Sequence, residues 1–289
     1  MNAKRRRLQS RVQRLCVYAA GACTLGVLLM LVVYILVKGL PHLTPELFSL
    51  HYNSENVSLF PALVNTVTMT LLSLLIAAPL GVFSAVYLVE YAKRGNKFVS
   101  VVRITAETLS GIPSIVYGLF GFLMFVIALD WDYSLLAGAF TLAIMILPVI
   151  MRTTEEALKS VPDSYREGSF GLGAGKLRTV FRIVLPAAMP GILAGIILSV
   201  GRIVGETAAL IYTAGTVAQI PNSLMGSGRT LSVHMYSLWS EGLNTDQSYA
   251  TAVVLLVIVA SLNALSSAAA KRLTGQKKER KKARCTQQK

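Results

Sequence analysis

Arg202 and Glu206 are the only charged residues in the apolar segment from Pro186 to Thr213. They lie four residues apart, on one face of a helix, where they can form an ion pair. A charged side chain inside a membrane costs roughly 3 kcal/mol or more, so such residues indicate a function. The planar guanidinium of Arg202 can donate two parallel hydrogen bonds to a tetrahedral oxyanion and remain charged. We expect Arg202 to attract an anion and Glu206 to hold Arg202 and keep the anion from binding too tightly. The alternative is a structural ion pair between helices.

The sequence lacks the motifs of ATP hydrolysis and of metal catalysis. Gly175-Lys176 is followed by Leu177 and position 170 is Phe, so both ends of the phosphate-loop pattern Gly-x4-Gly-Lys-Ser/Thr are missing. There is no His-Glu-x-x-His motif and no Cys/His cluster with metal spacing. We expect the three histidines to lie in solvated extracytoplasmic loops (His42, His51, His234). The chain is therefore expected to have no catalytic residue, metal site or cofactor of its own.

The composition indicates a membrane protein. Of the 289 residues, 54% are hydrophobic and only 15% are charged, yet the formal net charge is +14. A soluble domain of this size needs more charge to cover its surface, which argues against a soluble enzyme. A nucleic-acid-binding protein needs a basic face on a polar fold, and the rest of the chain is too apolar to provide one. Basic loops on a membrane protein account for both observations.

Long uncharged stretches predict six membrane spans, because a helix needs about 20 mostly apolar residues to cross a bilayer. The expected fold class is an all-α membrane protein with a permease domain over 15–270 and basic cytoplasmic tails over 1–14 and 271–289. Its spans are expected near 15–37, 62–89, 104–128, 133–151, 186–213 and 247–270.

The distribution of basic residues predicts the orientation in the membrane. Of the 28 Lys and Arg residues, 25 fall in the two tails and in the loops after the second and fourth spans. Cytoplasmic segments are enriched in Lys and Arg, so both termini are expected to be cytoplasmic in a multi-pass protein. The C-terminal tail is expected to be attracted to anionic membrane lipid.

The cytoplasmic loop over 152–185 is longer than a turn requires and has a helical pattern. Ser164 and Glu167 have capping-box spacing, which predicts the start of a short helix. Gly171 and Gly173 permit a sharp turn, and an apolar stripe then predicts a second helix (Leu177, Val180, Phe181, Val184). A helix-turn-helix against the cytoplasmic face can dock a partner or merely cap the bundle.

The run from Arg166 to Pro186 resembles the EAA loop of ABC-importer permeases, which have the type I importer fold. The residues in register are Glu167, Gly173, Ile183, Leu185 and Pro186, whereas Gly168 and Ser169 stand where the family prefers alanine. Glycine in a helix costs about 1 kcal/mol, so the first helix is expected to be less stable. The resemblance implies that these seven residues couple the chain to a separate ATP-binding subunit.

Four further segments are similar to the permease pair of phosphate importers, and most of all to the PstA type. They are YLVEY from Tyr87, IPSIVYGLFG from Ile112, the run from Arg152 to Gly173, and GRIVGETAALIYTAG from Gly201. The resemblance implies a permease subunit in a bacterial inner membrane, with Arg202 and Glu206 in the translocation pathway. The implied partners are a second permease (PstC type), an ATPase dimer that binds ATP-Mg (PstB type) and an extracytoplasmic phosphate-binding protein (PstS type).

Other functions remain open at this point. Arginine recognises sulfate, molybdate and phosphonate in much the same way as phosphate. A secondary transporter that needs no ATPase would have an inverted repeat, which the sequence does not show, and it would leave the long loop unexplained. An intramembrane enzyme would need a nucleophile with a base, or metal ligands, within the spans.

Overall fold

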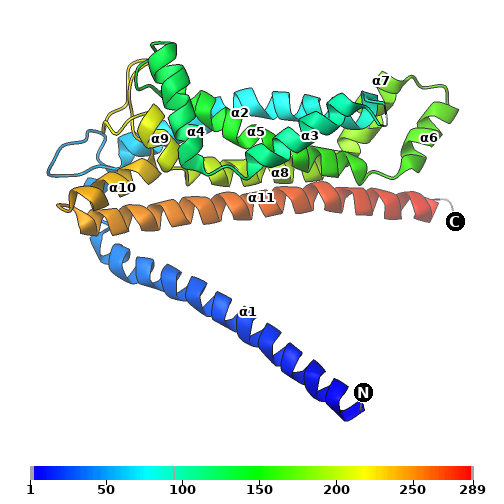
Figure 1. The fold of residues 1–289 in the computed structure, drawn as a ribbon, viewed down its shortest axis with the longest axis horizontal. Coiled ribbons are helices and arrows are strands. Elements are labelled where there is room, and N and C mark those ends of the chain that lie inside the picture. The colour runs from blue at the N-terminus through cyan, green and yellow to red at the C-terminus, as the bar shows by residue number, and fades with distance from the viewer. Residues whose placement is uncertain (1–2, 94, 288–289) are drawn as a thin grey trace.

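The computed structural model describes residues 3–93 and 95–287, and this part of the chain is helical without strands. Four long helices run along one axis (Figure 1). They are α2 (Phe60–Val86), α5 (Leu135–Lys159), α8 (Leu185–Val204) and α11 (Thr245–Gln287). A π-helical turn, η3 (Tyr87–Tyr91), extends α2. The predicted all-α membrane fold is confirmed.

The core lies around α5, which packs against both α2 and α8. Met69 of α2 and Leu142, Met145 and Ile146 of α5 are fully or almost fully buried in one cluster. Burying a large apolar side chain contributes about 1.5–3 kcal/mol in water. In a membrane the gain comes instead from close packing, because lipid is as apolar as the core.

Within residues 3–93 and 95–287, five helices are long and apolar enough to cross a membrane, and a bent pair of helices makes a sixth candidate. The predicted number of spans agrees with this, but the third span is not one straight helix. It consists of α3 (Lys97–Ser110) and α4 (Ser114–Gly121), the latter extended by η4 (Phe122–Ala128), with a bend of 103°. The break falls at Gly111-Ile112-Pro113, because proline has no amide hydrogen to donate and restricts the residue before it.

The fifth span also differs from the prediction of one helix over 186–213. Helix begins earlier, at α7 (Lys176–Thr179), and continues through the π-helical η5 (Val180–Val184) into α8. It ends at Val204, and a separate short helix, α9, covers Ala208–Thr213. The second helix of the predicted helix-turn-helix is therefore the first part of the fifth span.

The fourth span continues past its predicted end at residue 151, because α5 extends to Lys159. The predicted loop over 152–185 thus contains the end of α5, α6 (Asp163–Gly171) and α7. The expected capping box does not form: α6 starts at Asp163 after Pro162, and no side chain caps it. Proline at the N-cap already fixes a backbone angle that suits a helix start.

The first helix, α1 (Ala3–Gly39), diverges from the bundle and meets it only near its C-terminal end (Figure 1). There the hydroxyl groups of Tyr34 and Tyr249 lie 3.3 Å apart. The start of α1, the end of α11 and the pair α6 and α7 all lie at one end of the long axis. Two short 3-10 helices (Leu40–His42 and Pro45–Phe48), α9 and α10 (Leu231–Glu241) lie at the other end.

Candidate translocation and coupling site

Arg202 lies in the last turn of α8, just before the helix breaks. Its side chain is half-buried and makes no hydrogen bond or ion pair with any residue that the structure describes. The predicted ion pair with Glu206 is therefore wrong for this conformation. The cause is the end of α8 at Val204, since residues 202 and 206 share a helical face only in an unbroken helix.

Glu206 is buried, and its hydrogen bonds stabilise the break between α8 and α9. One carboxylate oxygen accepts a hydrogen bond from the amide of Ala209, 3.1 Å away, in the first turn of α9. Its backbone carbonyl accepts a bond from the hydroxyl of Ser232 on α10, at 2.5 Å. A carboxylate that receives an amide at the start of a helix satisfies a backbone donor that would otherwise be unpaired. Glu206 thus shapes the segment after Arg202 and leaves the guanidinium free.

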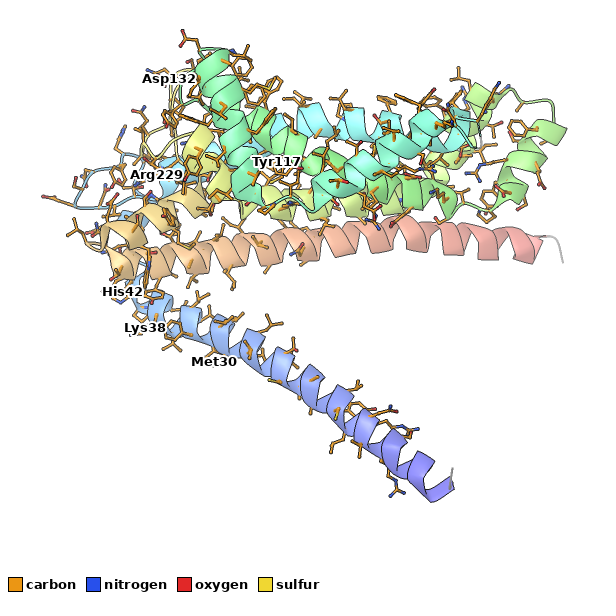
Figure 2. The ribbon with its side chains drawn as sticks, viewed as in Figure 1. Met30, Lys38, His42, Tyr117, Asp132 and Arg229 are labelled. Carbon is orange, nitrogen blue, oxygen red and sulfur yellow. The ribbon has the colours of Figure 1, made fainter. Side chains whose placement is uncertain are left out.

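The break in the third span lies close to the break in the fifth. Tyr117, on the first turn of α4, is within electrostatic reach of Arg202 and donates a hydrogen bond of 2.7 Å to the carbonyl of Leu109 on α3. Figure 2 places Tyr117 within the bundle, between its two ends. A Cβ on Gly118 would lie 2.8 Å from Cα of Ala209, so α4 and α9 meet backbone to backbone. Two interrupted helices therefore meet near an unpaired cation, and interrupted helices often form transport sites.

At the other end of the bundle, α6, a tight turn and α7 form the coupling element, residues 163–179. Gly173 has φ +78°, and its amide bonds to the carbonyl of Phe170 at 2.9 Å. This left-handed conformation suits glycine and costs other residues energy. The hydroxyls of Ser169 and Thr179, both buried, lie 2.8 Å apart and join α6 to α7.

The coupling element exposes large apolar side chains. Leu172, at the tip of the turn, is 90% exposed. Val180 and Val184 of the predicted stripe are buried, whereas its other two members face outward. The exposed apolar residues of the coupling element, together with Phe181 of the adjoining η5, make up what we call the docking surface (Tyr165, Phe170, Leu172, Leu177, Phe181). Large apolar side chains exposed together on one short element suggest a protein partner.

The remaining predicted coupling residues divide into two groups. Glu167 and Gly168 are exposed on α6, beside the docking surface. Ile183, Leu185 and Pro186 lie where η5 passes into α8, and Ile183 and Leu185 are half-buried. The structure therefore places the first group on the exposed surface of α6 and the second at the start of the fifth span.

An ion pair between Arg166 and Glu90 fixes the coupling element to the bundle. The sequence alone does not predict this pair. Nη2 of Arg166 on α6 lies 2.6 Å from Oε1 of Glu90 on η3, and both side chains are largely buried. Arg166 also donates to the carbonyls of Leu158 and Val161, at 3.0 and 2.8 Å. The hydrogen bond with Glu90 raises the pKa of Arg166, so the guanidinium remains charged. Beside it, Nζ of Lys176 lies 5.1 Å from the ring centre of Tyr91.

The last part of the coupling element, α7, and Arg202 belong to one continuous run of helix. It extends from Lys176 to Val204, through η5 and α8. Helices are stiff along their axis, so a displacement of α7 moves the end of α8 as well. This helix therefore connects the docking surface, at one end of the bundle, with the unpaired Arg202 near the end of α8.

A buried polar cluster lies at the end opposite the coupling element. Arg229 is only 4% exposed, and its guanidinium carbon lies 5.0 Å from the ring centre of Tyr52 (Figure 2). His234 on α10 is fully buried, so the expectation of a solvated loop histidine is wrong. Burial, reinforced by the charge of Arg229, lowers the pKa of His234 to about 3. Its imidazole is therefore neutral at physiological pH. No three His, Cys, Asp or Glu side chains group as metal ligands in the described part of the chain.

Comparison with protein families gives one match that covers most of the chain. Residues 77–276 match the model described as "Binding-protein-dependent transport system inner membrane component". A probable ABC transporter permease, YqgI of Bacillus subtilis, is 38% identical over 197 residues, which are 64% of this chain and 67% of that protein. The phosphate transport system permease PstA 1 of Mycobacterium tuberculosis H37Rv is 37% identical over 209 residues, 71% of this chain and 67% of that protein.

Solved structures of two transporters share the fold. A permease chain of the inward-facing MetNI methionine ABC transporter has a TM-score of 0.58 at 20% identity, and the match covers 74% of this chain and 94% of that chain. A bacterial alginate ABC transporter, solved with an alginate-bound periplasmic protein, gives a TM-score of 0.63 at 17% identity, covering 93% and 98%. At these identities the likeness concerns the fold alone.

Proposed function

The chain belongs to the family of binding-protein-dependent transport system inner membrane components, and on this premise we propose that it is a permease subunit of an ATP-driven phosphate importer. The type I ABC importer permease fold that the EAA loop predicts is confirmed. The family is one of membrane subunits rather than enzymes. The observation that carries the proposed substrate is the unpaired guanidinium of Arg202 near two helix breaks.

Phosphate suits this position for chemical reasons. A partly buried guanidinium without a counter-charge attracts an oxyanion and can donate two hydrogen bonds to it. Relatives at 37% and 40% identity, from Mycobacterium tuberculosis and Pasteurella multocida, are named phosphate transport system permeases. Glu206 contributes by fixing the break after Val204, which keeps Arg202 unpaired. A nearby carboxylate also limits how tightly an anion binds, so that the anion can leave.

The energy comes from an ATPase dimer that binds ATP-Mg and docks on the coupling element. The support is the docking surface, with Glu167, Gly168 and Gly173 beside it or within the turn. Closure of the ATPase would pull on α6 and α7, and the continuous helix to Val204 would pass this movement to Arg202. The bundle would then alternate between inward and outward access.

Two further partners complete the proposed transporter. A second permease subunit forms the other half of the pathway. An extracytoplasmic phosphate-binding protein docks on the outer loops, near residues 38–61 and 213–248. The end of the bundle that carries α6, α7, the start of α1 and the end of α11 is then cytoplasmic, as the basic residues predict.

Uptake measurements test the substrate. The chain should be expressed with its partner subunits in cells that lack their own phosphate importer, and uptake of labelled phosphate should be measured. We expect phosphate uptake that excess sulfate, molybdate or methylphosphonate does not inhibit. Equal uptake of sulfate would make the chain a permease for oxyanions in general.

Co-purification tests the coupling. Leu172→Asp places a charge at the tip of the docking surface and should reduce the amount of ATPase recovered with the chain. Leu243→Asp is the matched control, because Leu243 is 85% exposed at the opposite end of the bundle. Transport by the chain alone in liposomes would contradict the proposal and favour a secondary transporter.

A further inference from the structure

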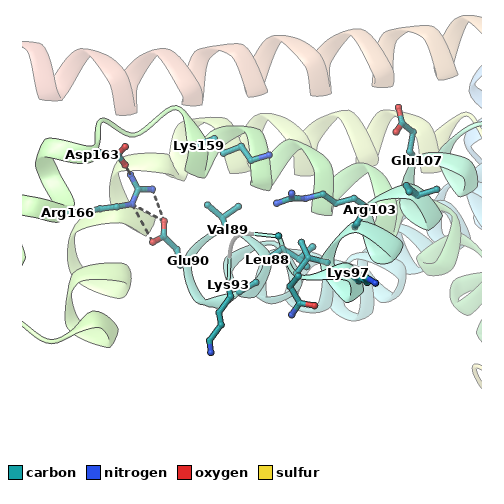
Figure 3. Close-up of a pocket in the computed structure, with 16 residues that line it drawn as sticks. Leu88, Val89, Glu90, Lys93, Lys97, Arg103, Glu107, Lys159, Asp163 and Arg166 are labelled. Atoms are coloured by element: carbon teal, nitrogen blue, oxygen red, sulfur yellow. Dashed lines mark hydrogen bonds and ion pairs between the residues drawn. The ribbon is translucent and has the colours of Figure 1, made fainter.

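A hollow of about 820 Å³ lies beside the coupling element, between η3, the start of α3, the end of α5 and α6. Figure 3 shows basic side chains from several elements on its wall, together with the acidic Glu90, Glu107 and Asp163. The basic residues that line it are Lys93, Lys97, Arg103, Lys159 and Arg166. The proposed function uses only Arg166 among them, so the hollow needs its own explanation.

Acidic partners neutralise some of these cations but not all. Arg166 is bound to Glu90 and, at 3.1 Å, to Asp163. Arg103 and Lys159 both contact Oε1 of Glu155, at 2.7 and 2.6 Å. Lys93 and Lys97 form no ion pair with any residue in the described ranges. Glu107 also lines the hollow, but it lies ten residues beyond Lys97 on α3, about 15 Å along the helix. The mouth near Lys93 and Lys97 is therefore positively charged.

An apolar groove of about 610 Å³ lies on the adjoining side of α3. Phe83 and Tyr87 line one wall, Phe98 and Val101 the other, and Met151 of α5 the floor. Leu88 lines both the groove and the basic hollow. Lys97 and Val101 are one helical turn apart, so the free cation and the groove share the outward face of α3. Phe98 and Val101 are both about 60% exposed there.

We propose that the groove and the mouth of the hollow together bind one anionic phospholipid from the cytoplasmic leaflet. An acyl chain lies against Phe98 and Val101 in the groove, and the phosphate group contacts Lys97 and Lys93. Basic pockets between membrane helices on the cytoplasmic side bind anionic headgroups, and each nearby lysine contributes about fivefold in affinity. The apolar groove favours a lipid over free phosphate, because free phosphate gains nothing from an apolar wall.

The site differs from the proposed translocation pathway and from the docking surface. Arg202 is absent from the lining of both hollows, and so are Leu172 and Leu177. The lipid would instead lie beside Glu90 and Arg166, the pair that fixes α6 to the bundle. Its binding is therefore measurable even in a chain that transports nothing.

Native mass spectrometry of the full chain, released from neutral detergent and titrated with defined lipids, tests the proposal. The probes are phosphatidylglycerol, phosphatidylcholine with the same acyl chains, and glycerol phosphate without acyl chains. We expect one phosphatidylglycerol to be retained at low concentration, with both other probes binding at least about tenfold more weakly. The double variant Lys93→Gln with Lys97→Gln should bind phosphatidylglycerol roughly 10- to 30-fold more weakly.

Two further variants separate this site from general charge attraction. Arg11→Gln with Arg14→Gln removes the same charge from exposed positions on α1 and should leave binding unchanged. Thr105→Phe fills the groove from an exposed position and should weaken phosphatidylglycerol binding while Lys93 and Lys97 remain. Equal losses in the two charge variants, or glycerol phosphate binding as tightly as the lipid, would overturn the proposal. Circular dichroism and size-exclusion profiles that match the unsubstituted chain establish that each variant is folded.

Discussion

Arg166 of α6 and Glu90 of η3 bind each other through Nη2 and Oε1, at 2.6 Å. The pair joins the coupling element to the end of α2, which runs through the bundle from Phe60. Arg166 also donates to the carbonyl of Leu158, in the last turn of α5, and to that of Val161, just past its end. One guanidinium therefore connects three segments, and movement of α6 is passed to α2 and α5 as well as along α7 to α8.

Replacing Glu90 should uncouple transport from ATP hydrolysis. Glu90→Gln leaves the buried guanidinium of Arg166 without its main counter-charge, and breaking a buried pair in this way costs about 3–5 kcal/mol. We expect uptake per inserted chain to fall at least about tenfold in vesicles that contain the assembled transporter. The control is Glu156→Gln, because Glu156 pairs with Arg152 at 3.3 Å on the exposed surface. Such surface pairs contribute about 0–1 kcal/mol, so similar uptake by the two variants would contradict this role.

Replacing Arg202 should abolish phosphate uptake without affecting insertion. Arg202→Gln removes the charge-assisted hydrogen bonds that we assign to the anion, each worth about 1.5–3 kcal/mol. Uptake should therefore fall by roughly 20-fold or more, while the amount of chain in the membrane stays the same. Arg202→Lys keeps the charge but loses the planar fork, so it should retain a part of the activity. Arg14→Gln, which removes a charge from an exposed position on α1, serves as a control. Unchanged uptake in Arg202→Gln would remove Arg202 from the mechanism.

The sequence predicts the number of spans because uncharged runs of about 20 residues are a strong signal. It does not predict the break after Val204, since Gly205-Glu206-Thr207 sits within a segment whose only other charged residue is Arg202. The break at Gly111-Ile112-Pro113 could have been predicted, because glycine and proline so close together usually mark a turn. Such local signals identify where a helix ends, but not the angle between its two halves.

The candidate site was predicted in part for similar reasons. Arg202 and Glu206 stand out because charges are rare in membrane spans. Their ion pair, however, requires an unbroken helix from residue 202 to 206, and the sequence wrongly predicts one. Glu90 and Arg166 are 76 residues apart in the chain, and nothing local to either one indicates the other. The burial of His234 was missed because its neighbours resemble a loop, whereas tertiary packing covers α10.

Replacing Gly173 should weaken the coupling element through backbone strain alone. A Cβ at this position meets no atom within 4 Å, but φ is +78°. Holding an L-residue in that conformation costs roughly 1–2 kcal/mol. Gly173→Ala should therefore reduce both the recovery of ATPase with the chain and the uptake of phosphate by several-fold. Gly175→Ala is the matched control: it has equal space and a φ of −70°, which alanine adopts without strain. A loss of the same size in both variants would assign the effect to the turn surface rather than to Gly173.

The buried imidazole of His234 should make the stability of the chain depend on pH. Burial, with the charge of Arg229, lowers the pKa of His234 from 6.5 to about 3 in the folded state. Between these values the unfolded chain binds a proton at this residue and the folded chain does not, so the free energy of unfolding falls as the pH falls. The contribution is fully present above pH 6.5, and about 2 kcal/mol of it should be lost at pH 5. Thermal unfolding in detergent, measured between about pH 7.5 and about pH 5, covers both sides of the ordinary histidine pKa of about 6.5 and gives this slope.

The variant His234→Gln should flatten the slope, whereas His51→Gln, which alters an exposed imidazole, should not. An unchanged slope in His234→Gln would mean that His234 is protonated in the folded chain.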